Sequence, residues 1–216
     1  MRLNEVKYLL YTSGSGVYGE ANVEFSEDYG PCMPISTYGA SKLACEALIS
    51  SYCHMFGLEA RAFRFANVVG PAQTHGVVYD FLRKLEQDPT TLHVLGNGSQ
   101  TKAYVHVEDV IIAMNTVLDE MLTNHSERFD IFNVATDDYI SVSEIANIVV
   151  AEVAPKAEIK FGTNDRGWLG DVPRVKFNTQ KIKKLGWTSS MNTVEAIKSS
   201  LRSMMLEERI NSIENK

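Results

Sequence analysis

The order of apolar and polar positions predicts strands and helices that alternate along most of the chain. Short apolar runs bounded by turn residues predict strands, and longer segments with apolar residues at three- and four-residue spacing predict helices. The predicted strands are 6–11, 60–66, 93–95, 129–134 and a short one near 159, and a turn at 96–98 leads into the segment 101–107. The predicted helices are 37–57, 77–86, 107–122, 179–185, 193–206 and one that ends at Val153 and is capped by Ser141 or Ser143. Strand, helix and strand in this order predict an α/β fold on a parallel sheet.

The helix predicted over 37–57 has the clearest amphipathic pattern. Its stripe of apolar or small residues consists of Ala44, Ala47, Leu48, Ser51 and Met55, a spacing typical of a helix face that packs on a core. Gly57 is a plausible C-cap. At the other end of the chain, we expect the tail 211–216 to be disordered.

A literal G-x-G-x-x-G occurs at residues 14–19, directly after the first predicted strand. In a dinucleotide site this motif opens a helix, whose N-terminus meets the pyrophosphate. Here residues 20–27 have no helical apolar face, and Pro31 and Pro34 keep the chain in a loop. We therefore reject these glycines as a phosphate-binding loop.

Composition and charge exclude several classes of protein. The 216 residues are 44% hydrophobic and 22% charged, which is ordinary for a globular protein, and the net charge of −6 argues against a nucleic-acid partner. No apolar run is long enough to span a bilayer and no signal peptide is recognisable, so we expect no membrane association and a cytoplasmic protein. The three cysteines form no C-x-x-C pair and the histidines share no ligand-like spacing, so no metal site is predicted.

The candidate chemistry lies at the start of the helix 37–57, where Tyr38 and Lys42 stand four residues apart. Positions i and i+4 share one face of a helix, so the phenol and the ammonium can project into the same volume. A lysine cation beside a phenol favours the phenolate and lowers the pKa of a phenol from its usual value near 10. Such a pair can exchange protons with a substrate hydroxyl near neutral pH.

Several ordered motifs resemble the extended short-chain dehydrogenase/reductase superfamily. They are Tyr11-Thr12-Ser13, Val17-Tyr18-Gly19-Glu20, Tyr38-Gly39-Ala40-Ser41-Lys42, the segments 64–71, 96–102 and 105–110, Phe132-Asn133-Val134 and Leu185-Gly186-Trp187. The likeness is closest to NAD-dependent nucleotide-sugar epimerases of the UDP-glucose 4-epimerase type. It implies the C-terminal part of a Rossmann-type parallel sheet with a smaller α/β substrate-binding domain. The NAD-binding part would be 1–70 with 104–136, and the substrate part 71–103 with 137–216.

The resemblance also implies an absence at the N-terminus. Members of this family begin with about a hundred residues that carry the Gly-rich fingerprint and the first strands. This chain starts just before the strand that delivers the catalytic serine or threonine, so we expect it to be N-terminally truncated. The adenine end of NAD would then have no obvious binding site, and the first strand would be an unpaired edge of the sheet.

The family mechanism uses bound NAD to remove hydride from sugar C4 and to return it to the other face of the sugar. By resemblance, Tyr38 takes the proton of the 4-hydroxyl group, and Lys42 bonds the nicotinamide ribose. Both residues, with Ser13 and Phe65, are expected to contact the cofactor. The family's serine or threonine position is occupied by Gly14, so Ser13 or Ser15 would supply the catalytic hydroxyl.

Substrate contacts are also implied by the resemblance. Asn67 and Val77 would lie near the sugar nucleotide, Lys102 would replace the family's diphosphate-binding arginine, and Asp171 would contact the ribose. A second arginine of the family is replaced by Trp168, so Arg166 or Arg174 would serve instead, with Arg174 preferred because Pro173 stiffens its approach. His75 could also touch the substrate.

The predicted function is a UDP-hexose 4-epimerase that binds NAD and forms a homodimer through the helix 37–57. Related dehydratases and decarboxylases carry an acidic residue beside the catalytic threonine. In this chain the corresponding turn, after the first predicted strand, is followed by no carboxylate before Glu20. A dehydratase, a decarboxylase or a non-catalytic sugar-nucleotide-binding fragment are the alternatives.

Overall fold

The computed structural model describes residues 1–125 and 127–214, with side chains described as far as Glu207. Its centre is a three-stranded parallel sheet of β1 (Tyr8–Gly14), β3 (Glu59–Phe65) and β8 (Phe129–Val134), in the order β1-β3-β8. Every residue of β3 is buried, as expected for the central strand of a sheet covered on both faces. The predicted α/β class is confirmed.

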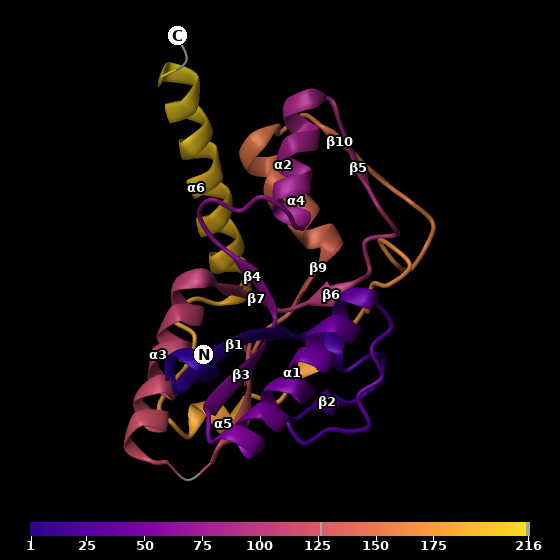
Figure 1. Ribbon diagram of the computed structural model, residues 1–216. Helices are drawn as coiled ribbons and strands as arrows, with labels where there is room; N and C mark the ends of the chain where they lie inside the picture. The colour runs from indigo at the N-terminus through magenta and orange to yellow at the C-terminus, as the bar shows by residue number, and fades with distance from the viewer. Residues whose placement is uncertain (126, 215–216) are drawn as a thin grey trace.

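Two helices cover the opposite faces of this sheet (Figure 1). They are α1 (Thr37–Phe56), which contacts all three strands, and α3 (Val107–Thr123). Side chains alternate along β3, so Phe63 and Phe65 join the hydrophobic cluster that includes Val110 of α3. Arg64 points to the other face, where it binds Glu46 of α1.

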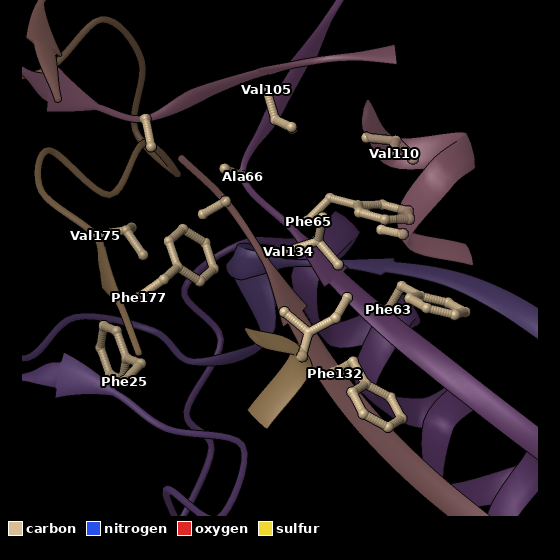
Figure 2. Close-up of a cluster of buried hydrophobic side chains, with 14 of the residues drawn as sticks. Phe25, Phe63, Phe65, Ala66, Val105, Val110, Phe132, Val134, Val175 and Phe177 are labelled. Atoms are coloured by element: carbon tan, nitrogen blue, oxygen red, sulfur yellow. The ribbon is translucent and has the colours of Figure 1, made fainter. Parts of the chain in front are cut away.

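Short elements extend this first core beyond the sheet. Among them, β2 (Glu24–Phe25) pairs in parallel with β11 (Lys176–Phe177), which places Phe25 opposite Phe177. Figure 2 shows both rings at one side of the cluster, with Phe63 and Phe132 at the other. The remaining short elements are η1 (Arg2–Asn4), η2 (Ser15–Val17) and α5 (Gln180–Lys183).

A second hydrophobic core lies beside the first and is built on helices (Figure 1). Its helices are α2 (Val77–Gln87), α4 (Val142–Val153) and α6 (Thr193–Glu214). Pairs of short strands join them: β4 (Asn67–Val69) with β7 (Tyr104–His106), β5 (Thr91–Val94) with β10 (Glu158–Phe161), and β6 (Thr101–Lys102) with β9 (Ile140–Ser141). Ser141 caps α4 in a box with Glu144, which resolves the choice between Ser141 and Ser143.

The predicted packing face of α1 is wrong. Leu48 and Met55 of the predicted stripe are 60% and 70% exposed, whereas Glu46 and Cys53 are buried. The prediction failed because Glu46 is buried in an ion pair with Arg64. A prediction from the spacing of apolar residues assigns a glutamate to the exposed face of a helix.

The segment 101–107, for which no strand was predicted, contains two short strands, β6 and β7, which pair with different partners. Expectations at the end of the chain need correction or limits. The last helix does not end near 206 but continues to Glu214, so residues 211–214 of the predicted disordered tail are helical. Residues 215 and 216 lie outside the described residues.

The two cores do not divide the chain into two simple halves. The first core includes Val172, Phe177 and Trp187. These residues come after α4 in the sequence, although α4 itself packs in the second core. The division at residues 70, 103 and 136 stays a prediction. In the part of the chain that the structure describes, β1 pairs only with β3, and no helix is long and apolar enough to cross a membrane.

Candidate active site

A cavity of about 950 Å³ lies at the carboxyl ends of β1 and β3, where both cores contribute to its wall. Parallel sheets bind ligands at this end of their strands. Nine of the ten predicted site residues line it: Ser13, Ser15, Tyr38, Lys42, Phe65, Asn67, Val77, Lys102 and Asp171. The structure therefore gathers residues that are spread over most of the sequence.

The start of α1 presents Tyr38 and Lys42 to one side of this cavity. Ser36 is the N-cap of α1, and its hydroxyl accepts a hydrogen bond from the Gly39 N–H at 3.0 Å. Lys42 Nζ lies 5.6 Å from the centre of the Tyr38 ring and donates to the Thr12 carbonyl at 2.7 Å. Tyr38 is 59% exposed, so its hydroxyl is accessible to a ligand.

A pair of glycines sets how closely the turn after β1 approaches α1. A Cβ atom on Gly39 would lie 2.2 Å from the carbonyl oxygen of Gly16 and 3.1 Å from the Pro34 Cβ. Only a glycine at position 39 allows this contact between backbones. The distance between this turn and Tyr38 therefore depends on the absence of a side chain at position 39.

Replacing Gly39 with alanine is expected to reduce the free energy of unfolding by about 2 kcal/mol, because the new methyl group must displace the backbone at Gly16. Urea unfolding measures the loss. Gly14→Ala is the matched control, because a Cβ there has no neighbour closer than 3.9 Å. Equal stability of the two variants would contradict the role of the glycine contact.

Ser13 and Ser15 differ in what their hydroxyl groups can do. Ser13 is buried, and its hydroxyl donates to Glu46 Oε1 at 2.6 Å. Glu46 in turn binds Arg64 through contacts of 2.7 and 3.1 Å. The one proton of the Ser13 hydroxyl is thus already committed, whereas Ser15 is half-buried and lines the cavity.

The sequence analysis missed the Glu46–Arg64 pair, which fixes β1 and β3 against α1. Tyr38, Lys42 and Glu46 follow one another at four-residue spacing on α1, so they share one face of the helix. The four-residue spacing from Tyr38 through Lys42 to Glu46 was the sequence signal that could have placed Glu46 on the buried face of α1.

Gly14 leaves open space beside the Tyr38 hydroxyl. Its backbone is extended, with φ of −170°, a conformation that any residue adopts. Apart from its neighbours in the chain, the one described atom that would lie within 4 Å of a Cβ at this position is the Tyr38 hydroxyl oxygen, at 3.9 Å. A serine Oγ, one bond further out, would reach hydrogen-bond distance of that oxygen.

Gly14→Ser is therefore expected to raise the rate of the reaction proposed below by about tenfold, the effect of one hydrogen bond worth roughly 1.4 kcal/mol in the transition state. Initial rates measure this gain. Gly14→Ala is the control, because it fills the same space without a hydroxyl. If serine and alanine gave equal rates, a hydroxyl at position 14 would have no part in proton transfer.

A cluster of charged residues gathers around Asp171, which lines the cavity. Lys102 Nζ donates to Asp171 Oδ1, and the Gly167 N–H donates to Asp171 Oδ2 at 3.3 Å. Arg166 Nη1 donates to the Asp171 carbonyl at 3.2 Å, while its Nη2 lies 2.9 Å from Glu20 Oε1. Lys102 and Asp171, predicted separately, thus meet as an ion pair.

Arg174 is the one predicted site residue that the structure places elsewhere. It bridges Thr101 through the backbone, is exposed, and does not line the cavity. Arg166, the alternative, donates to Asp171, which does line it. The geometry therefore favours Arg166 as the arginine nearer to the site.

The remaining predicted residues complete the wall. Phe65 and Asn67 lie at the end of β3 and the start of β4, and Val77 opens α2. Asn67 contacts the Tyr104 hydroxyl, and burial raises the pKa of Tyr104. This tyrosine stays neutral at any ordinary pH and can only donate or accept hydrogen bonds.

Two side chains from loops line the cavity as well. Trp168 is 59% exposed, and its ring lies against Gly170, whose backbone in turn approaches Ser36. His75 comes from the loop before α2. Within residues 1–125 and 127–214, no group of three or more His, Cys, Asp or Glu side chains is arranged to hold a metal ion.

Known proteins share this fold. The chain is 30% identical over 196 residues to a putative UDP-glucose 4-epimerase of Methanocaldococcus jannaschii, a match that covers 89% of this chain and 61% of that protein. A crystal structure of UDP-galactose 4-epimerase superposes with a TM-score of 0.83 at 35% identity, covering 96% of this chain and 65% of that one. The Thermus thermophilus UDP-glucose 4-epimerase, solved as a complex with NAD, gives 0.76 at 28% identity, covering 94% and 65%.

These matches establish a Rossmann-like α/β fold. The chain spans 61% of the relative from M. jannaschii and 65% of each of the two solved structures. A family profile described as "NAD dependent epimerase/dehydratase family" matches residues 1–135, more than half of the chain. The chain therefore belongs to the NAD-dependent epimerase/dehydratase family, a family of enzymes.

Proposed function

We propose that this chain carries the proton-transfer and substrate-binding parts of a nucleotide-sugar epimerase, acting on a UDP-hexose at C4. The observation that carries the proposal is that Tyr38 and Lys42 line the same cavity as Lys102 and Asp171. The first pair can exchange a proton with a sugar hydroxyl, and the Lys102 ammonium can bind an anion. A sugar joined to a diphosphate has both groups.

Tyr38 is the proton acceptor and donor in this proposal. Its hydroxyl is accessible at the cavity rim, and no side chain at Gly14 covers it. Lys42 holds its place through the bond to the Thr12 carbonyl and sets its cation beside the phenol ring. Asn67 and Val77 line the same cavity and border the sugar nucleotide.

The residues present fit the nicotinamide end of NAD. Tyr38, Lys42, Ser13 and Phe65 line the cavity together at the carboxyl ends of the strands, where an ammonium can bond ribose hydroxyls. Ser13 would contact the cofactor through its backbone and not through its hydroxyl, because the hydroxyl donates its hydrogen bond to Glu46. When bound, NAD supplies the exchange of hydride with the sugar carbon.

An epimerase fits the turn after β1 better than a dehydratase or a decarboxylase of the same family. The first carboxylate after this turn is Glu20, and its side chain binds Arg166 instead of lining the cavity. The structure does place one carboxylate near this turn, that of Glu46, but it binds Ser13 and Arg64. Neither Glu20 nor Glu46 lines the cavity, and epimerisation needs no additional acid.

The direct experiment incubates the protein with NAD and UDP-glucose and follows the appearance of UDP-galactose by chromatography, with UDP-glucuronic acid and UDP-N-acetylglucosamine as parallel substrates. Interconversion of one pair supports the proposal. Release of a 4-keto-6-deoxy sugar or of carbon dioxide would instead identify a dehydratase or a decarboxylase.

A second candidate is a non-catalytic protein that binds sugar nucleotides. It is favoured by one observation: the G-x-G-x-x-G at 14–19 enters the short turn η2 and then a loop, so it opens no helix for a pyrophosphate. Calorimetry separates the candidates, because binding of a UDP-sugar without binding of NAD supports the second.

The homodimer and the cytoplasmic location remain proposals. Leu48 and Tyr52 on α1 are 60% and 46% exposed, which supports an apolar contact between two copies of this helix.

A further inference from the structure

The ammonium group of Lys42 lies over two tyrosine rings. Its Nζ is 5.6 Å from the centre of the Tyr38 ring and 5.2 Å from the centre of the Tyr11 ring. Both distances fall within the range of about 6 Å over which the face of an aromatic ring attracts a cation. Tyr38 lines the cavity, whereas Tyr11 does not. An effect of Tyr11 on a ligand in the cavity therefore passes through another residue, and Lys42 is in contact with it.

The fold places Tyr11 behind the pair because of two periodicities. Side chains alternate along a strand, so Tyr11 shares the face of β1 that Ser13 presents to α1. On α1, Tyr38, Lys42 and Cys45 follow one another at spacings of four and three residues, which puts them on one face of the helix. The Tyr11 hydroxyl contacts the Cys45 side chain. Strand and helix together thus fix the Tyr11 ring beside Lys42.

The groups that hold the ammonium on this side are uncharged. Lys42 donates to the carbonyl of Thr12 at 2.7 Å. Burial raises the pKa of Tyr11, so this phenol stays neutral at any ordinary pH. The carboxylate one turn further along α1, that of Glu46, is already bound in the buried ion pair described above. These contacts hold the cation without neutralising it, so its charge remains available to a phenolate at Tyr38.

We propose that Tyr11 is a positioning residue for proton transfer, which holds the Lys42 ammonium beside Tyr38 with the face of its ring. A lysine side chain is flexible and its ammonium is strongly hydrated, and its attraction for a phenolate weakens with distance. The Tyr11 ring limits that motion. The inference rests on the proposed function, because it takes Tyr38 and Lys42 as the proton-transfer pair, and it adds a residue that lies outside the cavity.

The first test compares Tyr11→Leu with Tyr11→Phe in the interconversion of UDP-hexoses at saturating NAD. Leucine removes the ring, and kcat is expected to fall about fivefold, the size of one cation–π contact. Phenylalanine keeps the ring, so kcat is expected to stay within about twofold of the wild type. Affinity for UDP, measured by calorimetry, is expected to stay within about twofold in both variants, because Tyr11 does not line the cavity. Tyr11→Met replaces the leucine variant if circular dichroism shows that the latter does not fold.

The second test needs no turnover. Reductive methylation with isotope-labelled formaldehyde marks every lysine, and Lys42→Arg identifies the Lys42 signal in NMR spectra. Methyl groups above an aromatic ring resonate upfield, so this signal is expected to move downfield in Tyr11→Leu and to stay in place in Tyr11→Phe. Tyr8→Leu is the matched control, because Tyr8 is in the same strand and its ring centre lies 5.1 Å from Lys7 Nζ. It is expected to move the Lys7 signal and to leave the Lys42 signal and kcat unchanged.

Three results would overturn the inference. A wild-type kcat in Tyr11→Leu would show that the ring does not act on the pair. Equal losses in Tyr11→Leu and Tyr11→Phe would assign the effect to the hydroxyl and its contact with Cys45. An unmoved Lys42 signal in Tyr11→Leu would show that the ring does not hold the ammonium. If the wild-type chain interconverts no UDP-hexose, the proposed function fails, and the NMR comparison still decides whether Tyr11 holds Lys42.

Discussion

Replacing Tyr38 with phenylalanine is expected to lower the rate of UDP-hexose interconversion by about 100- to 10,000-fold, the usual contribution of a positioned acid–base group. The hydroxyl lost is the one that faces the cavity beside Gly14, and the ring that lies beside Lys42 stays. Affinity for UDP is expected to stay within about twofold, because an interaction made mainly in the transition state affects the rate and not the binding of substrate.

The measurement pairs initial rates in the presence of NAD with calorimetric titration of UDP. Tyr52→Phe is the matched control, since it removes a hydroxyl from the same helix at a site outside the cavity. A Tyr38→Phe variant that keeps the wild-type rate would assign proton transfer to another residue. A variant that loses rate and UDP binding together would show that the tyrosine acts in binding instead.

Glu46→Ala is expected to cost about 3–5 kcal/mol of the free energy of unfolding, because it leaves the buried Arg64 guanidinium without its counter-ion. The side chains of Glu46 and Arg64 are both only 4% exposed, so water cannot replace the lost partner. The Ser13 hydroxyl loses its acceptor as well. Losses of this size can exhaust the stability of an ordinary domain.

A double-mutant cycle tests the origin of that loss by urea unfolding. Glu46→Leu combined with Arg64→Met removes both charges and keeps apolar volume, and the double variant is expected to be more stable than either single variant. Additive losses in the cycle would show that the two side chains act independently. The ion pair would then not be what fixes α1 to β3.

The sequence could predict the elements that build the first core because their patterns are local. Periodicity located α1, β3 and β8 to within a few residues, and the motifs around Tyr38 and Asn67 indicated the family. The strand predicted at 93–95 was less well placed, and β6 and β7 were not predicted, because the limits of short strands depend on partners that lie far away in the sequence.

The site could be predicted only as far as residue identity indicates chemistry. Lys102 and Asp171 were named separately, but their ion pair depends on how the loop after β10 folds back, which no spacing encodes. The same loop places Arg166 within hydrogen-bond distance of Asp171. Arg174 comes later in the sequence and is exposed. The burial of Glu46 was missed because a glutamate on a helix is normally a surface residue.

The attachment of Lys42 to β1 has a consequence for the timescale of the site. The carbonyl of Thr12, which accepts the hydrogen bond from Lys42, belongs to a strand that pairs with β3. The Lys42 contact therefore lasts only as long as β1 stays docked on β3. Amide hydrogen exchange in β1 therefore sets an upper limit on the lifetime of the Tyr38–Lys42 arrangement, whereas exchange in β3 reports the global stability of the fold.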